Sequence, residues 1–129
     1  HVDIRLPIGA DTDEIENEIK SIIMDSGVNG VEYEVNWINL GNSTPIDAKI
    51  VQSLKKNAEK IWNIEVLPAY QWASSDAKYY RELNIPTIQY GPSNTEGIHS
   101  YNENVDIEDV LNASKIYLLT LCDLLGIEQ

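Results

Sequence analysis

The sequence has few of the residues that would tie it to a membrane, a nucleic acid or an oxidising compartment. Its single cysteine, Cys122, cannot form a disulfide within the chain, so nothing indicates an oxidising compartment. No apolar run approaches the roughly 20 residues that a membrane helix needs. Only 9 basic side chains accompany 21 acidic ones, and the formal net charge of −12 would repel phosphate backbones. We therefore expect neither a membrane protein nor a nucleic-acid-binding protein.

We expect no targeting segment at the start of the chain. The sequence begins at His1 instead of Met, and no charged stretch followed by an apolar stretch precedes the first strand-like run, as a signal peptide would require. We interpret the chain as an excised piece of a longer protein and expect a cytoplasmic location.

The residues that are present suit a globular protein. The chain has 129 residues, of which 43% are hydrophobic, which is enough to bury a core without disulfides. Alternating apolar residues predict strands at 2–6 and 31–37, and helical spacing predicts a helix from Thr12 to Gly27 between them. Two strands and one helix do not make a stable sheet domain, so this first unit is expected to be incomplete.

A linker is predicted at 41–45, where the sequence reads Gly-Asn-Ser-Thr-Pro. Thr44 is expected to be the N-cap of the next helix, with Pro45 at the first helical position and Asp47 in the capping box. Helices and short apolar strands then alternate, which predicts an α/β architecture with a mainly parallel sheet. The expected elements are a helix to Trp62, a strand at 64–70, a helix at 74–83, a strand at 85–90 and a long helix capped by Asp106.

A polar loop at 91–105 contains the most reactive side chains. His99 is the only histidine away from the terminus, and a neutral imidazole is the commonest metal ligand in proteins. Glu103, four residues on, could hold the second ring nitrogen of His99. The alternative is an ordinary solvated loop histidine. A catalytic zinc needs three protein ligands, so any metal site must be completed by residues from elsewhere.

Two further places allow a functional and a structural interpretation. Ser74, Ser75 and Asp76 either cap a helix or present backbone amides to a carboxylate or a metal-site ligand. Arg5 either binds a substrate carboxylate with its planar guanidinium or pairs with Asp3.

Four motifs, in this order, resemble the C-terminal portion of the co-catalytic zinc amidohydrolases. That family includes succinyl-diaminopimelate desuccinylase, acetylornithine deacetylase and the glutamate-releasing carboxypeptidases. The motifs are Asp3-Ile4-Arg5-Leu6-Pro7, Ser74-Ser75-Asp76-Ala77-Lys78, Ile85-Pro86 through Tyr90-Gly91-Pro92, and His99-Ser100-Tyr101-Asn102-Glu103. The resemblance covers the whole chain with spacing like that of the family.

The resemblance implies an α/β fold made of parts of two domains. Residues 1–41 would be half of a ferredoxin-like lid domain, which commonly dimerises, and residues 42–129 the C-terminal part of a zinc-dependent catalytic domain. His99 would be the last zinc ligand. Glu103 would contact a zinc ligand without binding the zinc itself. Arg5, Ser74, Ser75 and Asp76 would line the substrate pocket.

The implied function is that of a fragment of a zinc-dependent amide hydrolase. Its substrates would be N-acyl amino acids or peptides with a free carboxylate, and its cofactor one or two zinc ions, with cobalt possible. The family's other ligands and its general base are absent from these residues, so no catalytic residue is assigned and the chain alone is expected to be inactive. The expected partners are the remaining N-terminal part of the enzyme, a second copy bound through the lid, and the small substrate. The alternative is a non-catalytic binding or dimerisation module.

Overall fold

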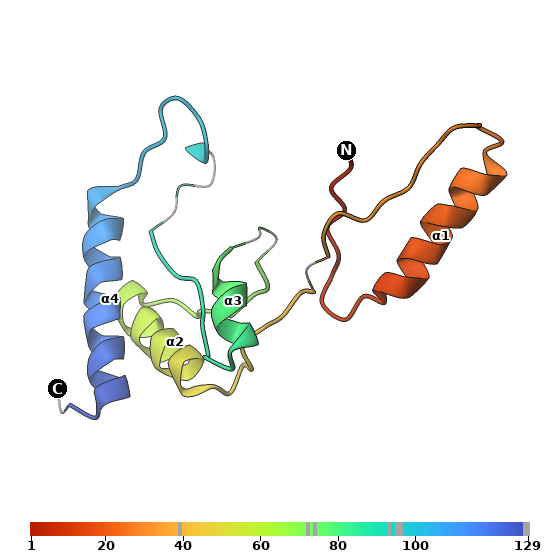
Figure 1. Ribbon diagram of the computed structural model, residues 1–129. Helices are drawn as coiled ribbons and strands as arrows, with labels where there is room; N and C mark the ends of the chain where they lie inside the picture. The colour runs from red at the N-terminus through yellow and green to blue at the C-terminus, as the bar shows by residue number, and fades with distance from the viewer. Residues whose placement is uncertain (39, 72, 74, 93, 95–96, 128–129) are drawn as a thin grey trace. The chain divides into compact units, whose positions relative to one another are not determined.

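The computed structural model describes residues 1–38, 40–71, 73, 75–92, 94 and 97–127. Its helices, in chain order, are α1 (Thr12–Asp25), α2 (Lys49–Trp62), α3 (Ala77–Glu82) and α4 (Ile107–Leu125). The chain divides into two compact units, His1–Asn42 and Ser43–Gln129 (Figure 1).

The predicted α/β fold is wrong, and with it the half ferredoxin-like sheet and the parallel sheet of the second unit. Within the described residues every regular element is a helix, and the segments expected as strands are irregular. A strand exists only where a neighbour pairs with its backbone. Here the Val66 N–H donates to Glu59 Oε1 at 3.2 Å and the Thr87 N–H donates to Thr44 Oγ1 at 2.9 Å. Side chains therefore satisfy backbone groups that a ladder would have used.

Helix α1 begins where the sequence supplies a side-chain cap. The Asp11 carboxylate accepts hydrogen bonds from the backbone N–H groups of Asp13 and Glu14, at 3.0 and 3.1 Å. The two acidic residues lie in the first turn, where the helix dipole favours negative charge. The helix is followed by Gly27, whose φ of +68° suits glycine. Helix α1 therefore begins and ends close to the predicted positions.

The side chains on one face of α1 are partly shielded from solvent. Ile15, Ile19 and Ile23 recur at helical spacing and are half-buried, whereas Ile22 is 61% exposed. Among the described residues of this unit none is fully buried. The Nζ of Lys20 lies 5.7 Å from the centre of the Tyr33 ring, a contact between the helix and the segment that follows it. This unit therefore has little core of its own.

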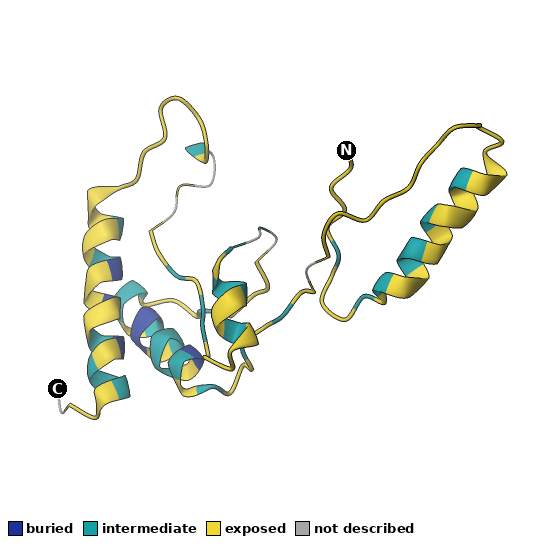
Figure 2. Cartoon of the chain, viewed as in Figure 1, coloured by how far each residue is buried: buried dark blue, intermediate teal, exposed yellow. Residues whose placement is uncertain are grey.

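The core of the second unit lies where α2 packs against α4. Figure 2 shows the buried positions of this unit on these two helices, facing one another. The buried apolar residues are Val51 and Ala58 from α2, with Ala113 and Ile116 from α4. Small side chains at Ala58 and Ala113 let two helix backbones approach closely, which is how ridges of one helix fit the grooves of another.

Hydrogen bonds from side chains join the segment at 85–90 to other parts of the second unit. Thr44 is not the N-cap of α2, which begins at Lys49 after Ala48 without a side-chain cap. Instead the Thr44 hydroxyl donates to the Thr87 carbonyl at 2.6 Å. Arg81 Nη1 donates to the same carbonyl at 3.1 Å. Both backbone groups of Thr87 are thus satisfied away from any sheet.

A cluster of aromatic side chains holds the end of this segment. Trp62 Nε1 donates to the Tyr90 hydroxyl at 2.8 Å, and the Tyr117 hydroxyl donates to the Tyr90 carbonyl. The rings of Tyr90 and Tyr117 meet edge to face, with their centres 5.8 Å apart. Burial, and then the neighbouring Tyr90, raise the pKa of Tyr117 above its ordinary value. The chain therefore enters the polar loop from a fixed point on α2 and α4.

A polar cluster extends the contact between α2 and α4. The buried side chain of Asn57 donates to Thr120 Oγ1 at 3.3 Å and to Asp123 Oδ2 at 3.0 Å. Lys56 Nζ lies 3.4 Å from the same carboxylate oxygen. The hydrogen bond from Asn57, together with Lys56, lowers the pKa of Asp123.

The lowered pKa of Asp123 predicts a loss of stability in acid. A carboxyl whose pKa is depressed by folding stabilises the protein above its unfolded pKa of about 3.9, and this stabilisation is lost as pH falls through the lower folded value. We expect the free energy of unfolding to fall below about pH 4, and to fall less in Asp123→Asn. Urea titrations at pH 7 and pH 3 measure this. Asp47→Asn, an exposed aspartate, is the control, and an equal acid response in both variants would contradict the assignment.

Candidate functional site

The predicted metal ligand lies in a short loop closed by hydrogen bonds. The Ser100 N–H and hydroxyl both donate to the Gly97 carbonyl, at 3.0 and 2.8 Å. The Glu103 N–H donates to the Ser100 carbonyl at 3.3 Å. His99 is exposed and has a left-handed backbone, with φ of 61°. The loop therefore presents the imidazole outward from a defined turn.

Glu103 contacts His99, but not as the sequence predicts. The bond that joins them runs from the backbone N–H of His99 to Glu103 Oε2, at 3.2 Å. Within the described residues, neither ring nitrogen of His99 makes a hydrogen bond. The glutamate therefore acts on the backbone of His99 and leaves the ring nitrogens to other partners.

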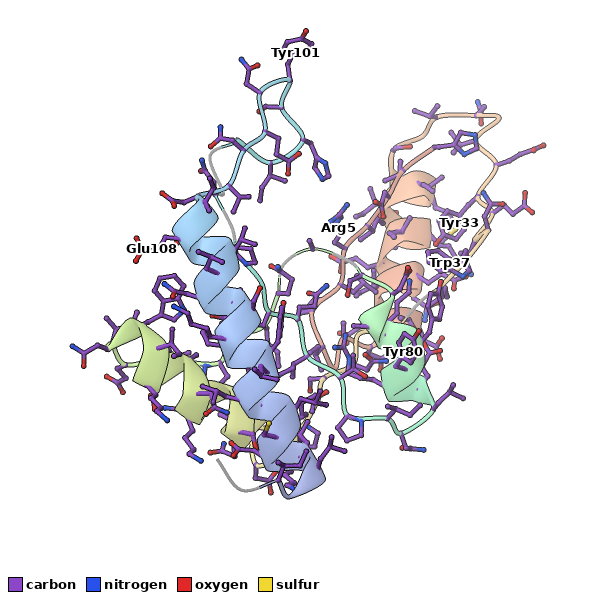
Figure 3. All side chains as sticks on the ribbon, turned by 90° about the vertical axis from the view of Figure 1, so that its left-hand side faces the viewer. Arg5, Tyr33, Trp37, Tyr80, Tyr101 and Glu108 are labelled. Carbon is purple, nitrogen blue, oxygen red and sulfur yellow. The ribbon has the colours of Figure 1, made fainter. Side chains whose placement is uncertain are left out.

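Neighbouring side-chain amides complete the loop, and no motif in the sequence identifies them. Asn104 Nδ2 donates to the Asn102 carbonyl at 2.8 Å, and Asn94 Nδ2 donates to Asn104 Oδ1 at 3.3 Å. The only signal in the sequence was the density of asparagines between 94 and 104. Tyr101 is fully exposed at the outer end of the loop (Figure 3).

The candidate substrate-binding residues are divided between the two units. Arg5 belongs to the first unit, where its Nε lies 3.8 Å from Asp3 Oδ2, both side chains being exposed. Ser75 and Asp76 lead into α3, and their carbonyls accept from the N–H groups of the first helical turn. Asp76 occupies the N-cap position, but its side chain accepts no capping hydrogen bond from the helix. Ser74 lies outside the described residues.

The donor set does not make up a metal site by itself. Among the described residues, no group of three His, Cys, Asp or Glu side chains is arranged to hold a metal ion. The imidazole of His99 fits a single ligand position, whereas a catalytic zinc requires three protein ligands. The remaining donors would have to come from other residues.

A separate cleft of about 830 Å³ lies in the second unit between α2, α4 and the segment at 88–92. Its surface is only slightly more apolar than polar, and its lining comprises Ile50, Leu54, Gln71, Ile88, Gln89, Tyr90, Gly91, Pro92, Tyr117, Thr120, Leu121 and Leu124. Its lining includes neither His99 nor Glu103. The cleft is therefore separate from the loop that carries these two residues.

The chain is similar in sequence to curated enzymes over most of its length. It is 29% identical over 98 residues to a succinyl-diaminopimelate desuccinylase of Nitrosomonas eutropha, a match covering 74% of this chain and 25% of the relative. It is 23% identical over 124 residues to a [LysW]-lysine/[LysW]-ornithine hydrolase of Saccharolobus islandicus, a match covering 96% of this chain and 34% of the relative. No solved structure matches it.

The model of peptidase family M20/M25/M40 matches residues 3–123, and the chain belongs to that family. This family is generally metal-dependent. The chain spans between a quarter and a third of the length of the two relatives named above. Among the helices that the structure describes, none combines the length and apolar character needed to cross a bilayer.

Proposed function

We propose that this chain is the C-terminal portion of a zinc-dependent amide hydrolase. The observation that carries the proposal is the family match over residues 3–123, which includes the loop with His99. The names of the relatives, a desuccinylase and a [LysW]-lysine/[LysW]-ornithine hydrolase, support cleavage at a derivatised amino acid. The substrate class is an N-acyl amino acid or a peptide with a free carboxylate.

The proposed roles follow the chemistry of each side chain. His99 supplies one ligand to zinc, or to cobalt, because its exposed imidazole has no hydrogen bond within the described residues. Arg5 binds the substrate carboxylate, because a guanidinium offers two parallel donors to a carboxylate. Ser74, Ser75 and Asp76 contact the substrate. Glu103, from the same loop, contacts His99 without binding the metal itself.

The proposed partners are the remaining N-terminal part of the enzyme and a second copy of the protein. One observation supports an added partner: α4 exposes a row of large apolar side chains along its length. They are Ile107, Leu111, Leu118, Leu121 and Leu125. Exposed apolar rows of this kind mark interaction surfaces. Residues 1–41 are proposed to belong to a lid domain and residues 42–129 to a catalytic domain, in a cytoplasmic protein.

Hydrolysis by the complete natural protein tests this function. We expect it to release the acyl group from N-succinyl or N-acetyl amino acids, to stop when a chelator removes the metal, and to recover with added zinc or cobalt. Methyl esters of the same substrates lack the charged carboxylate and should react at least about tenfold more slowly. The ester comparison also controls for non-specific hydrolysis. A complete protein that binds these compounds without cleaving them, metal being present, would favour the binding module.

A further inference from the structure

We propose that Glu103 is a positioning residue that sets the direction of the His99 side chain through the backbone amide of His99. The proposal rests on the proposed role of His99 as a metal ligand. It differs from the expected arrangement, in which the glutamate would hold the imidazole itself. The distinguishing observation is the hydrogen bond from the His99 N–H to Glu103 Oε2 at 3.2 Å.

The backbone of His99 needs such support. Its φ of 61° lies in the left-handed region, which residues other than glycine seldom adopt. Two other described non-glycine residues share this conformation, and both are asparagines, Asn63 and Asn84. Asn63 ends α2 as its C-cap, a position that commonly takes this conformation. His99 has no helix end to account for its backbone, so its support comes from within the loop.

Glu103 is placed to supply that support. Its own N–H donates to the Ser100 carbonyl at 3.3 Å, and Ser100 is in turn bound to the Gly97 carbonyl. The chain thus folds back on itself, and a Cβ added at Gly97 would lie 3.7 Å from the Glu103 Cα. From this position the glutamate side chain reaches back four residues to the His99 amide. An aspartate, one methylene shorter, would not span the same gap.

This arrangement keeps both ring nitrogens of His99 available. A metal-binding histidine uses one ring nitrogen for the metal, and the other commonly donates to an outer partner. Within the described residues neither nitrogen is engaged, and Glu103 bonds to the backbone. The glutamate therefore fixes the direction in which the side chain leaves the backbone without occupying a nitrogen that the metal would need.

Amide hydrogen exchange at His99 in the 129-residue chain tests the bond directly. Glu103→Ala removes the acceptor, and we expect the His99 amide to exchange about 5- to 10-fold faster, as the loss of one exposed hydrogen bond predicts. Glu103→Gln keeps a carbonyl oxygen at the same reach and should restore slow exchange, whereas Glu103→Asp should not. Glu65→Ala removes an exposed glutamate elsewhere and is the control. The amide of Ile116, in the core, should be unchanged in all four variants.

The outcomes separate this proposal from the proposed function. If Glu103→Ala leaves His99 exchange unchanged, or if Glu103→Gln behaves like alanine, the positioning role is wrong. In the complete protein, activity should fall in Glu103→Ala and recover in Glu103→Gln. If His99→Ala abolishes activity while Glu103→Ala retains it, the function stands and the positioning role falls. If His99→Ala remains fully active, the metal-ligand role, and the positioning role that depends on it, are both wrong.

Discussion

Replacing His99 with alanine in the complete protein should lower turnover by more than about a hundredfold and reduce the bound metal. Loss of a residue that merely supports a metal ligand typically costs about 10- to 100-fold in affinity or activity, so loss of the ligand itself should cost more. The exposed loop position of His99 makes a large effect on folding unexpected, because the substitution opens no cavity. Turnover on an N-acyl amino acid and metal content of the purified protein are the two measurements.

The matched control for this variant is His1→Ala, because His1 is the only other histidine in the sequence. It should retain activity and metal. Unchanged turnover in His99→Ala would mean that the loop histidine is an ordinary solvated residue. Lost turnover with full metal content would instead place His99 in contact with the substrate and remove it from the metal.

The helices could be predicted from the sequence because their determinants are local. Asp106 was expected to cap the last helix, and its carboxylate accepts from the Glu108 N–H at 2.8 Å. A helix satisfies its own backbone within four residues, so spacing and capping residues suffice. A strand depends on a partner that the sequence pattern does not identify. The alternation at 31–37 predicts a half-buried strand, but every residue of this segment is exposed and irregular in the structure. The pattern does not reveal whether another segment pairs there.

The candidate site was only partly predictable for a related reason. The residue types and spacing of His99 and Glu103 suggested an interaction, and they are in contact. Which group of His99 bonds to Glu103 depends on a backbone angle that residue types alone do not determine. The hydrogen bond between Thr44 and Thr87 joins residues 43 positions apart, and no local sequence pattern predicts it. The capping pattern at Thr44 was therefore misleading, since its hydroxyl had a distant partner.

Truncation of Ile116 should be the most destabilising single change in the second unit. Its side chain is fully buried between α4 and α2, with 0% of its surface exposed. Removing buried methylene groups from such a position typically costs about 2–5 kcal/mol, because a cavity remains where the side chain packed. Few other apolar residues are fully buried among those that the structure describes, so few other contacts can compensate for the loss. Urea denaturation of Ile116→Ala, followed by circular dichroism, measures the loss.

Leu118→Ala is the matched control, since it truncates an apolar side chain two residues along the same helix where 62% of the surface is exposed. In the 129-residue chain it should lower the free energy of unfolding by less than about 1 kcal/mol, because folding removes little of this side chain's surface from water. The same change in the complete protein distinguishes two situations. If the exposed row on α4 is covered by the remaining part of the enzyme, Leu118→Ala should then cost several times more than in the short chain, approaching the cost of Ile116→Ala. An equally small cost in both would mean that this face of α4 remains in water and that the rest of the protein binds elsewhere.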